Sequence, residues 1–186
     1  MSTAPKCAEV AARILTQLGY TPKEVELARI AAYMHDIGNV VNRHDHALSG
    51  ATMAFRILDK MGMEPPDVAA VITAIGHHDD STAYPVNAIA AALILADKTD
   101  VRRSRVRNKD MSTFDIHDRV NYSVERSEVL LDLPGRTVTL SLSINTEVCA
   151  VMDYFEIFLQ RMLLSRKAAE TLDLKFRLEI NGQILL

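Results

Sequence analysis

Hydrophobic residues recur at helical spacing through the N-terminal half of the chain, and turn or cap residues divide them into segments. Gly19 ends one such run, Thr21-Pro22 has the signature of a helix start, and Pro65-Pro66 opens another run. The last segment is apolar on nearly every side, which predicts a helix surrounded by the others. The pattern predicts helices over residues 10–18, 22–38, 45–61, 65–78 and 88–97.

Towards the C-terminus the periodicity changes from helical to alternating. Pro134-Gly135 is a turn dipeptide, and apolar and polar residues alternate in the run that follows it. A second alternating run lies close to the C-terminus, and an amphipathic segment separates the two runs. These patterns predict strands at 124–133, 136–144 and 172–180, and a helix from Thr146 through Leu163.

A charged stretch at residues 102–110 separates the helical pattern from the alternating one, and we expect a domain boundary there. The expected fold is mainly α, with a helical bundle over residues 1–110 followed by a small α+β (ββαβ) appendage over residues 111–186. An exposed apolar sheet or a free strand edge in this appendage favours self-association, so we expect a homodimer.

The composition is that of an ordinary globular protein, with 186 residues, of which 48% are hydrophobic and 24% charged. The net charge of −3 gives no general attraction to nucleic acid, which we do not expect as a partner. Cys7 and Cys149 are too few for a disulfide framework or a thiolate zinc site. The longest apolar run, residues 88–96, is far shorter than the roughly 20 residues that cross a bilayer. Together with a polar N-terminus, these features predict a cytoplasmic protein with no membrane partner.

Histidine and aspartate gather at the predicted helix ends. Five of the 6 histidines lie between positions 35 and 78, and imidazole is a frequent metal ligand. A bundle that brings the helix ends together would make an imidazole-rich site bridged by a carboxylate, which suits a mid-series divalent ion. A further pair, His44-Asp45, is expected to cap the third helix. The helix ends in question carry His35-Asp36, His46, His77-His78 and Asp97.

The order of these residues resembles the HD superfamily of metal-dependent phosphohydrolases. The segment AAYMHDIGN resembles the family's helix that ends in His-Asp, and HALSG resembles the His-x-x-x-Gly that opens the next helix in two-metal members. GHHDDSTAYP and AALILADKTD are similar to the His-His-Glu block, Tyr-Pro and terminal Asp helix of the HD-GYP branch. Asp79 replaces the Glu, and the glycine before Tyr-Pro is absent, which argues against a true HD-GYP phosphodiesterase. The resemblance covers approximately residues 5–107.

The resemblance implies an HD-type helical metal-binding domain that holds one or two divalent ions, of Mn, Fe, Co, Ni, Mg or Zn. In two-metal relatives an initial His, the His-Asp pair and the final Asp hold the first ion, and the bridging Asp with three more His holds the second. Carried over to this chain, the first site retains His35, Asp36 and Asp97. The second site is complete, with Asp36, His46, His77 and His78.

Lys6 stands where the family has its first His, in the stretch KCAEVA that corresponds to the family's His-Ser-x-x-Val-Ala. A protonated ammonium cannot ligate a metal, so Lys6 is expected either beside the ion or in solvent. We therefore hypothesise that the second site binds metal better than the first.

The residues that would act on a phosphorylated substrate lie at two helix ends. Asp36 and Lys98 are the catalytic candidates, and Asp100 can orient a water molecule or Lys98. Lys98, Arg102 and Arg105 are spaced four and three apart on one helical stripe, where they could hold phosphate oxygens. A solvated basic surface explains the charges at 102–109 equally well.

The resemblance therefore implies a metal-dependent phosphohydrolase that cleaves a phosphomonoester or a nucleotide phosphate with a metal-bound hydroxide. The alternative is a catalytically silent HD-type regulatory module that binds a nucleotide or a partner protein. Lys6 favours the silent module, and the intact remaining ligands favour the enzyme. The sequence does not choose among substrates or ions, and it leaves the role of the appendage open.

Overall fold

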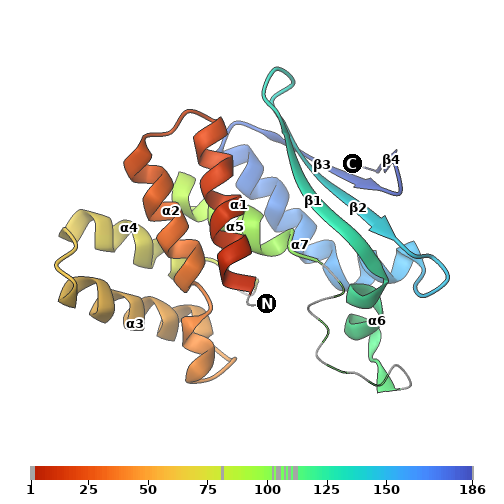
Figure 1. Ribbon diagram of the computed structural model, residues 1–186, viewed down its shortest axis with the longest axis horizontal. Coiled ribbons are helices and arrows are strands. Elements are labelled where there is room, and N and C mark those ends of the chain that lie inside the picture. The colour runs from red at the N-terminus through yellow and green to blue at the C-terminus, as the bar shows by residue number, and fades with distance from the viewer. Residues whose placement is uncertain are drawn as a thin grey trace.

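The computed structural model describes residues 3–80, 82–101, 103, 106, 108, 110 and 113–185. Within these residues, a bundle of helices packs beside a 4-stranded sheet (Figure 1), which confirms a mainly α fold with a small α+β portion. No helix in the described part of the chain combines the length and the apolar character needed to span a membrane.

The N-terminal helices occupy the predicted segments, except that the first helix begins at Thr3, well before residue 10. The capping box between Thr21 and Glu24 starts the second helix, where the sequence predicts a helix start. The fifth helix is buried over Ile89–Ala96 and packs against four other helices, which confirms that it is surrounded. The bounds are α1 (Thr3–Gln17), α2 (Pro22–Met34), the 3-10 helix η1 (Ile37–Val40), α3 (His46–Lys60), α4 (Pro65–Gly76) and α5 (Ala88–Lys98).

The second helix ends earlier than predicted, at Met34 instead of Gly38. The chain turns into η1, which packs against the start of α3. At Gly38 a Cβ atom would overlap the carbonyl oxygen of His46 and lie 2.6 Å from the backbone nitrogen of Gly50. Two glycines thus let η1 and α3 touch backbone to backbone, and this contact brings the end of α2 next to the start of α3.

The sheet contains β1 (Val124–Asp132), β2 (Thr137–Ile144), β3 (Lys175–Ile180) and β4 (Gln183–Ile184), in that order across the sheet. β1 and β2 are antiparallel, β2 and β3 are parallel, and β3 and β4 are antiparallel. The long helix α7 (Val151–Thr171) makes the crossover between β2 and β3. It packs against β3 and α5, and therefore joins the sheet to the helical bundle (Figure 1).

Three details of the C-terminal part were predicted wrongly. The crossover helix begins at Val151, because the Asn145 side chain accepts a hydrogen bond from the backbone N–H of Glu147 (3.0 Å) and stabilises a turn in the preceding residues. This helix continues beyond Leu163 to Thr171, so β3 begins at Lys175 and not at residue 172. In addition, α6 (Ile116–Ser123) and β4 are present where no element is predicted.

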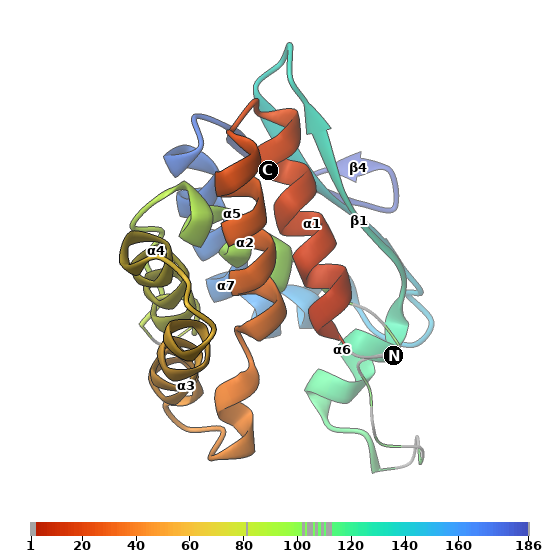
Figure 2. The same ribbon diagram turned by 60° about the vertical axis from the view of Figure 1, so that its left-hand side comes forward.

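The helices and the sheet share one hydrophobic core. Arg13 on α1 donates to the carbonyl oxygen of Val129 on β1 (2.9 Å), and Ser127 donates to the carbonyl oxygen of Thr99 (2.9 Å). In two views related by rotation, α1 lies between α2 and β1 (Figure 1, Figure 2). The division at residue 110 remains a prediction, and the two parts that it separates are in direct contact.

Candidate metal centre

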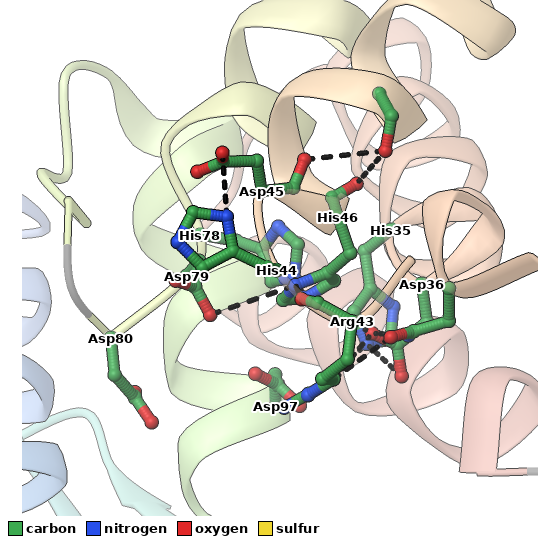
Figure 3. A network of polar contacts seen from close by, with 12 residues as sticks. His35, Asp36, Arg43, His44, Asp45, His46, His78, Asp79, Asp80 and Asp97 are labelled. Atoms are coloured by element: carbon green, nitrogen blue, oxygen red, sulfur yellow. Dashed lines mark hydrogen bonds and ion pairs between the residues drawn. The ribbon is translucent and has the colours of Figure 1, made fainter. Parts of the chain in front are cut away.

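The structure brings together the ends of four helices, each of which presents a histidine or an aspartate. His35 is the C-cap residue of α2 and Asp36 follows it, while His46 is the first residue of α3. His78 lies just beyond α4, and Asp97 lies in the last turn of α5. Figure 3 shows these side chains pointing toward one another. We call the five residues the donor cluster: His35, Asp36, His46, His78 and Asp97.

Short distances connect the donor atoms of this cluster. His35 Nε2 lies 3.6 Å from Asp36 Oδ2 and 3.6 Å from Asp97 Oδ1. His46 Nε2 lies 3.4 Å from Asp36 Oδ1 and 3.2 Å from His78 Nε2. Donor atoms within 4.8 Å of one another form two groups, His35-His78-Asp97 and Asp36-His46-His78. The two groups share His78 and therefore lie next to each other.

The three imidazoles are oriented in the same way, with Nδ1 bonded to a backbone carbonyl. A carbonyl oxygen only accepts hydrogen bonds, so each Nδ1 donates its proton and each Nε2 faces the cluster, where it offers a lone pair when the ring is neutral. Histidine ligands in metal sites are held by such bonds to their second nitrogen. The carbonyls and distances are Ala32 for His35 (2.7 Å), Arg43 for His46 (3.0 Å) and Ile75 for His78 (2.6 Å).

Each of the two donor groups has the spacing that a divalent cation requires. Ligands at about 2.0–2.1 Å from a tetrahedral ion are separated from one another by about 3.3 Å, close to the separations of 3.2–3.6 Å between neighbouring donors. Three imidazoles and two carboxylates make a mixed nitrogen and oxygen set, which suits a mid-series divalent ion. The residues present can therefore hold a metal.

Burial and charge adjust the protonation of these groups. Burial lowers the pKa of His78 to about 4, so this ring is neutral and able to ligate at neutral pH. Burial also acts to lower the pKa of His35, but contact with the carboxylates of Asp97 and Asp36 outweighs it and raises the pKa above its usual value. Burial would raise the pKa of Asp97, yet the charge of Lys98 and the contact with His35 hold it well below the ordinary range.

Lys98, predicted to act in catalysis and to bind phosphate, is buried among carboxylates. Its Nζ atom lies 2.6 Å from Asp97 Oδ2 and 3.0 Å from Asp80 Oδ1, and its side chain is 5% exposed. Burial would lower the pKa of Lys98, but Asp97 and Asp80 raise it, so the ammonium remains charged. The roles predicted for Lys98 stay predictions, while Arg102 and Arg105 lie outside the described residues.

The structure places other predicted site residues outside the donor cluster. His77 is the C-cap residue of α4, where its Nδ1 donates to the carbonyl oxygen of Thr73 (2.9 Å). It belongs to neither donor group found among the described residues, and lines a separate pocket of about 350 Å³. Lys6 Nζ lies 3.1 Å from Asp100 Oδ1, so Asp100 contacts Lys6. Both residues line a pocket of about 770 Å³ between α1, the end of α5 and β1.

Asp45 is the N-cap residue of α3, in agreement with the prediction for the His44-Asp45 pair. Its side chain does not cap the helix, however, but contacts the ring of His44 (2.7 Å). The backbone of Asp45 is left-handed, with φ of 55°, and its carbonyl oxygen accepts from the N–H groups of Leu48 and Ser49. This turn places His46, the first residue of α3, in the donor cluster.

Two residues beside Asp36 were missed in the sequence. Asn39 Nδ2 donates to Asp36 Oδ1 (2.8 Å), and Arg43 Nη1 lies 3.7 Å from the same oxygen. The Arg43 side chain is 67% exposed, so its guanidinium lies at the open side of the cluster (Figure 3). No motif indicates either residue; only their nearness in sequence to His35-Asp36 could have suggested them.

The fold is mainly helical, and its donor cluster could hold a metal ion. The model of the HD domain family matches residues 6–156, and the chain belongs to this family. HD domains are in general metal-dependent hydrolases of a phosphohydrolase superfamily. The match reaches from α1 into α7 and thus includes β1 and β2. A search of curated proteins found no sequence that matches this chain.

Proposed function

We propose that this protein is a metal-dependent phosphohydrolase that cleaves a phosphomonoester or a nucleotide phosphate. The observation that carries the proposal is the convergence of the Nε2 atoms of His35, His46 and His78 with the carboxylates of Asp36 and Asp97. Nitrogen and carboxylate oxygen donors directed at one region favour a cation between them.

The five donor residues would hold a divalent ion, which polarises a phosphoryl oxygen and lowers the pKa of a coordinated water to near 7. Asp36 is the more exposed of the two carboxylates, at 36% against 15% for Asp97. It therefore lies where a substrate would enter, in the position of a catalytic carboxylate. Asn39 holds Asp36 Oδ1 by a hydrogen bond and limits the rotation of this side chain.

The charges near the cluster favour a phosphate group as the substrate. Asp36 and Asp97 carry two negative charges, which one divalent ion would neutralise, and the guanidinium of Arg43 adds a positive charge beside Asp36 at the open side. Arg43 can form paired hydrogen bonds with two phosphate oxygens. The pocket of about 770 Å³ is lined by Ala96, the residue before Asp97 in the sequence, and is our candidate for the space that receives the organic part of an ester.

Metal content and hydrolysis test the proposal together. Elemental analysis of the purified protein gives the ion and its stoichiometry, and p-nitrophenyl phosphate, its bis ester and nucleotides are assayed with Mn²⁺ or Co²⁺. We expect phosphomonoester or nucleotide hydrolysis that is lost in His46→Ala and retained in His117→Ala, because His117 is exposed on α6. Wild-type protein that binds no metal and hydrolyses none of these substrates would contradict the proposal.

The second candidate function is a silent regulatory module that binds a nucleotide. The pairing of Lys6 with Asp100 favours it, because the resemblance puts Lys6 where two-metal relatives have a first histidine, and a protonated ammonium cannot ligate a metal. Equilibrium dialysis with nucleotides separates the two functions: a nucleotide that binds with metal and is recovered intact supports the module, and its hydrolysis supports the enzyme.

A further inference from the structure

A series of ion pairs runs from the crossover helix to the donor cluster. Arg161 Nε lies 3.2 Å from Asp80 Oδ2, and Asp80 Oδ1 lies 3.0 Å from Lys98 Nζ. Lys98 Nζ lies 2.6 Å from Asp97 Oδ2, and Asp97 Oδ1 lies 3.6 Å from His35 Nε2. The charges alternate along the series, and each of the two aspartates uses one oxygen for each neighbour.

The position of Lys98 determines how Asp97 meets the donor cluster. Because the ammonium occupies Oδ2, the carboxylate presents Oδ1 to His35 and to the space between the donors. A buried ammonium is costly unless its hydrogens are bonded, and Asp80 supplies the second carboxylate that Lys98 contacts. Asp80 therefore holds Lys98 in the position from which it orients Asp97.

Arg161 in turn holds Asp80. Its guanidinium stacks over the ring of Phe158, with 5.0 Å between Cζ and the ring centroid, and its side chain is 24% exposed. The same helix contacts the α4–α5 connection a second time, where Thr171 Oγ1 donates to the carbonyl oxygen of Pro85 (3.4 Å). Figure 3 shows Asp80 on the side of Asp97 that faces the blue C-terminal part of the ribbon.

We propose that Arg161 is a positioning residue for the metal centre, which acts through Asp80 and Lys98 to fix the carboxylate of Asp97. The helix α7 thereby contributes to the geometry of the site. The inference rests on the metal-binding role proposed above. It assigns a function to a residue outside the HD-like motifs, 81 positions from its partner in the sequence. It also gives the crossover helix a role beyond the sheet.

Cobalt binding tests this inference without relying on catalysis. Co²⁺ is titrated into wild-type protein, Arg161→Met and Asp80→Asn, and both the dissociation constant and the visible spectrum of the bound ion are recorded. We expect each substitution to weaken binding about tenfold, as partners of metal ligands commonly do, and to change the spectrum because Asp97 is no longer held in one orientation. The double variant should bind about as well as Asp80→Asn alone, since both changes break the same series.

Arg166→Met is the matched control, because Arg166 lies one turn further along α7 and is exposed. It should bind Co²⁺ like the wild type, and Arg161→Lys should recover part of the affinity that Arg161→Met loses. A merely structural role would lower the melting temperature of the metal-free protein and leave the affinity and spectrum unchanged. If Arg161→Met does not fold, Asp80→Asn gives the same test, because Asp80 is an exposed loop residue.

Wild-type affinity and spectrum in the folded Arg161→Met and Asp80→Asn proteins would overturn this inference and leave the metal centre standing. Failure of the wild-type protein itself to bind Co²⁺ would overturn the metal centre and the inference together. Loss of hydrolysis alone, with binding intact in the wild type, concerns the proposed function and not the positioning role.

Discussion

The Nε2 atoms of His46 and His78 face each other at 3.2 Å. A cation bound between the two rings would take both of these atoms as ligands. The arrangement persists because Nδ1 of each ring is bonded to a backbone carbonyl one turn earlier in the chain. The helix ends thus hold the site ready for a cation before one binds.

Metal removal should therefore destabilise the protein. At a free ion concentration 100 times the dissociation constant, binding adds about 2.7 kcal/mol to the free energy of unfolding. For a chain of this length, that corresponds to a rise in melting temperature of about 5–10 °C. Differential scanning fluorimetry with a chelator and with added Mn²⁺ or Zn²⁺ measures the shift. The shift should vanish in His46→Ala, and an equal shift in that variant would place the ion elsewhere.

The number of ions can be decided by comparing His35→Ala with His46→Ala. Both side chains contact Asp36, and the two donor groups share His78, so we expect one ion per chain and similar losses of affinity from the two substitutions. The hypothesis of a stronger second site predicts instead that His46→Ala costs more affinity than His35→Ala. Isothermal titration calorimetry gives the stoichiometry and both affinities.

The stability of the metal-free protein should depend on pH in opposite ways through His35 and His78. The pKa of His35 is raised on folding, so its contribution is complete below the usual value of 6.5 and is lost as the pH rises through the raised pKa. The pKa of His78 is lowered to about 4, so its contribution is present above 6.5 and is lost as the pH falls towards 4.

Urea denaturation in a chelator, at a series of pH values, measures these contributions. The difference in unfolding free energy between wild type and His35→Gln should shrink as the pH rises above 6.5, and the difference for His78→Gln should shrink as the pH falls from about 7 to about 4. If the two free-energy differences changed with pH in the same direction, burial of His78 and the carboxylate contacts of His35 would not have the effects described above.

Gly38→Ala should destabilise the fold and loosen the site. The added Cβ atom would collide with the backbone of His46 and Gly50, which cannot move away as a flexible side chain can. We expect a loss of about 1–3 kcal/mol in unfolding free energy, measured by urea denaturation. Gly76→Ala is the control, since its Cβ would meet only Ala51 at 3.7 Å; equal losses in the two variants would contradict the close packing of η1 on α3.

Arg43→Ala should weaken substrate binding. A hydrogen bond to a charged group contributes about 1.5–3 kcal/mol, so loss of the guanidinium should raise KM for p-nitrophenyl phosphate about tenfold or more and change kcat less. Arg56→Ala, at an exposed position on α3, is the matched control and should leave KM unchanged. An unchanged KM in Arg43→Ala would remove Arg43 from the phosphate site.

Local chemistry explains which elements the sequence could predict. Thr21 and Glu24 form their capping box within four residues, and the apolar stretch at 88–96 needs no distant partner to be identified as a central helix. In contrast, α6 carries a weak and largely polar pattern, and the start of α7 depends on a turn held by Asn145. The apolar residues of this turn continue the spacing of those in α7, so the sequence pattern alone starts the helix too early.

The candidate site divides in a similar way. The order of histidines and aspartates in the sequence indicates ligands at helix ends, but the grouping of the donors depends on the approach of η1 to α3 at Gly38 and Gly50. The sequence groups His77 with His78, whereas the end of α4 directs the two rings to different sides. Arg161 and Asp80 meet only through tertiary packing, so no local pattern could have paired them.

The place of α7 in the chain has a consequence for synthesis. Every member of the donor cluster leaves the ribosome before α7 does, because these residues lie between positions 35 and 97 while α7 begins at Val151. The helical bundle of a nascent chain can thus bring its imidazoles and carboxylates together before Arg161 is present to pair with Asp80. With the positioning role proposed for Arg161, the carboxylate of Asp97 gains its final orientation only after α7 has been synthesised.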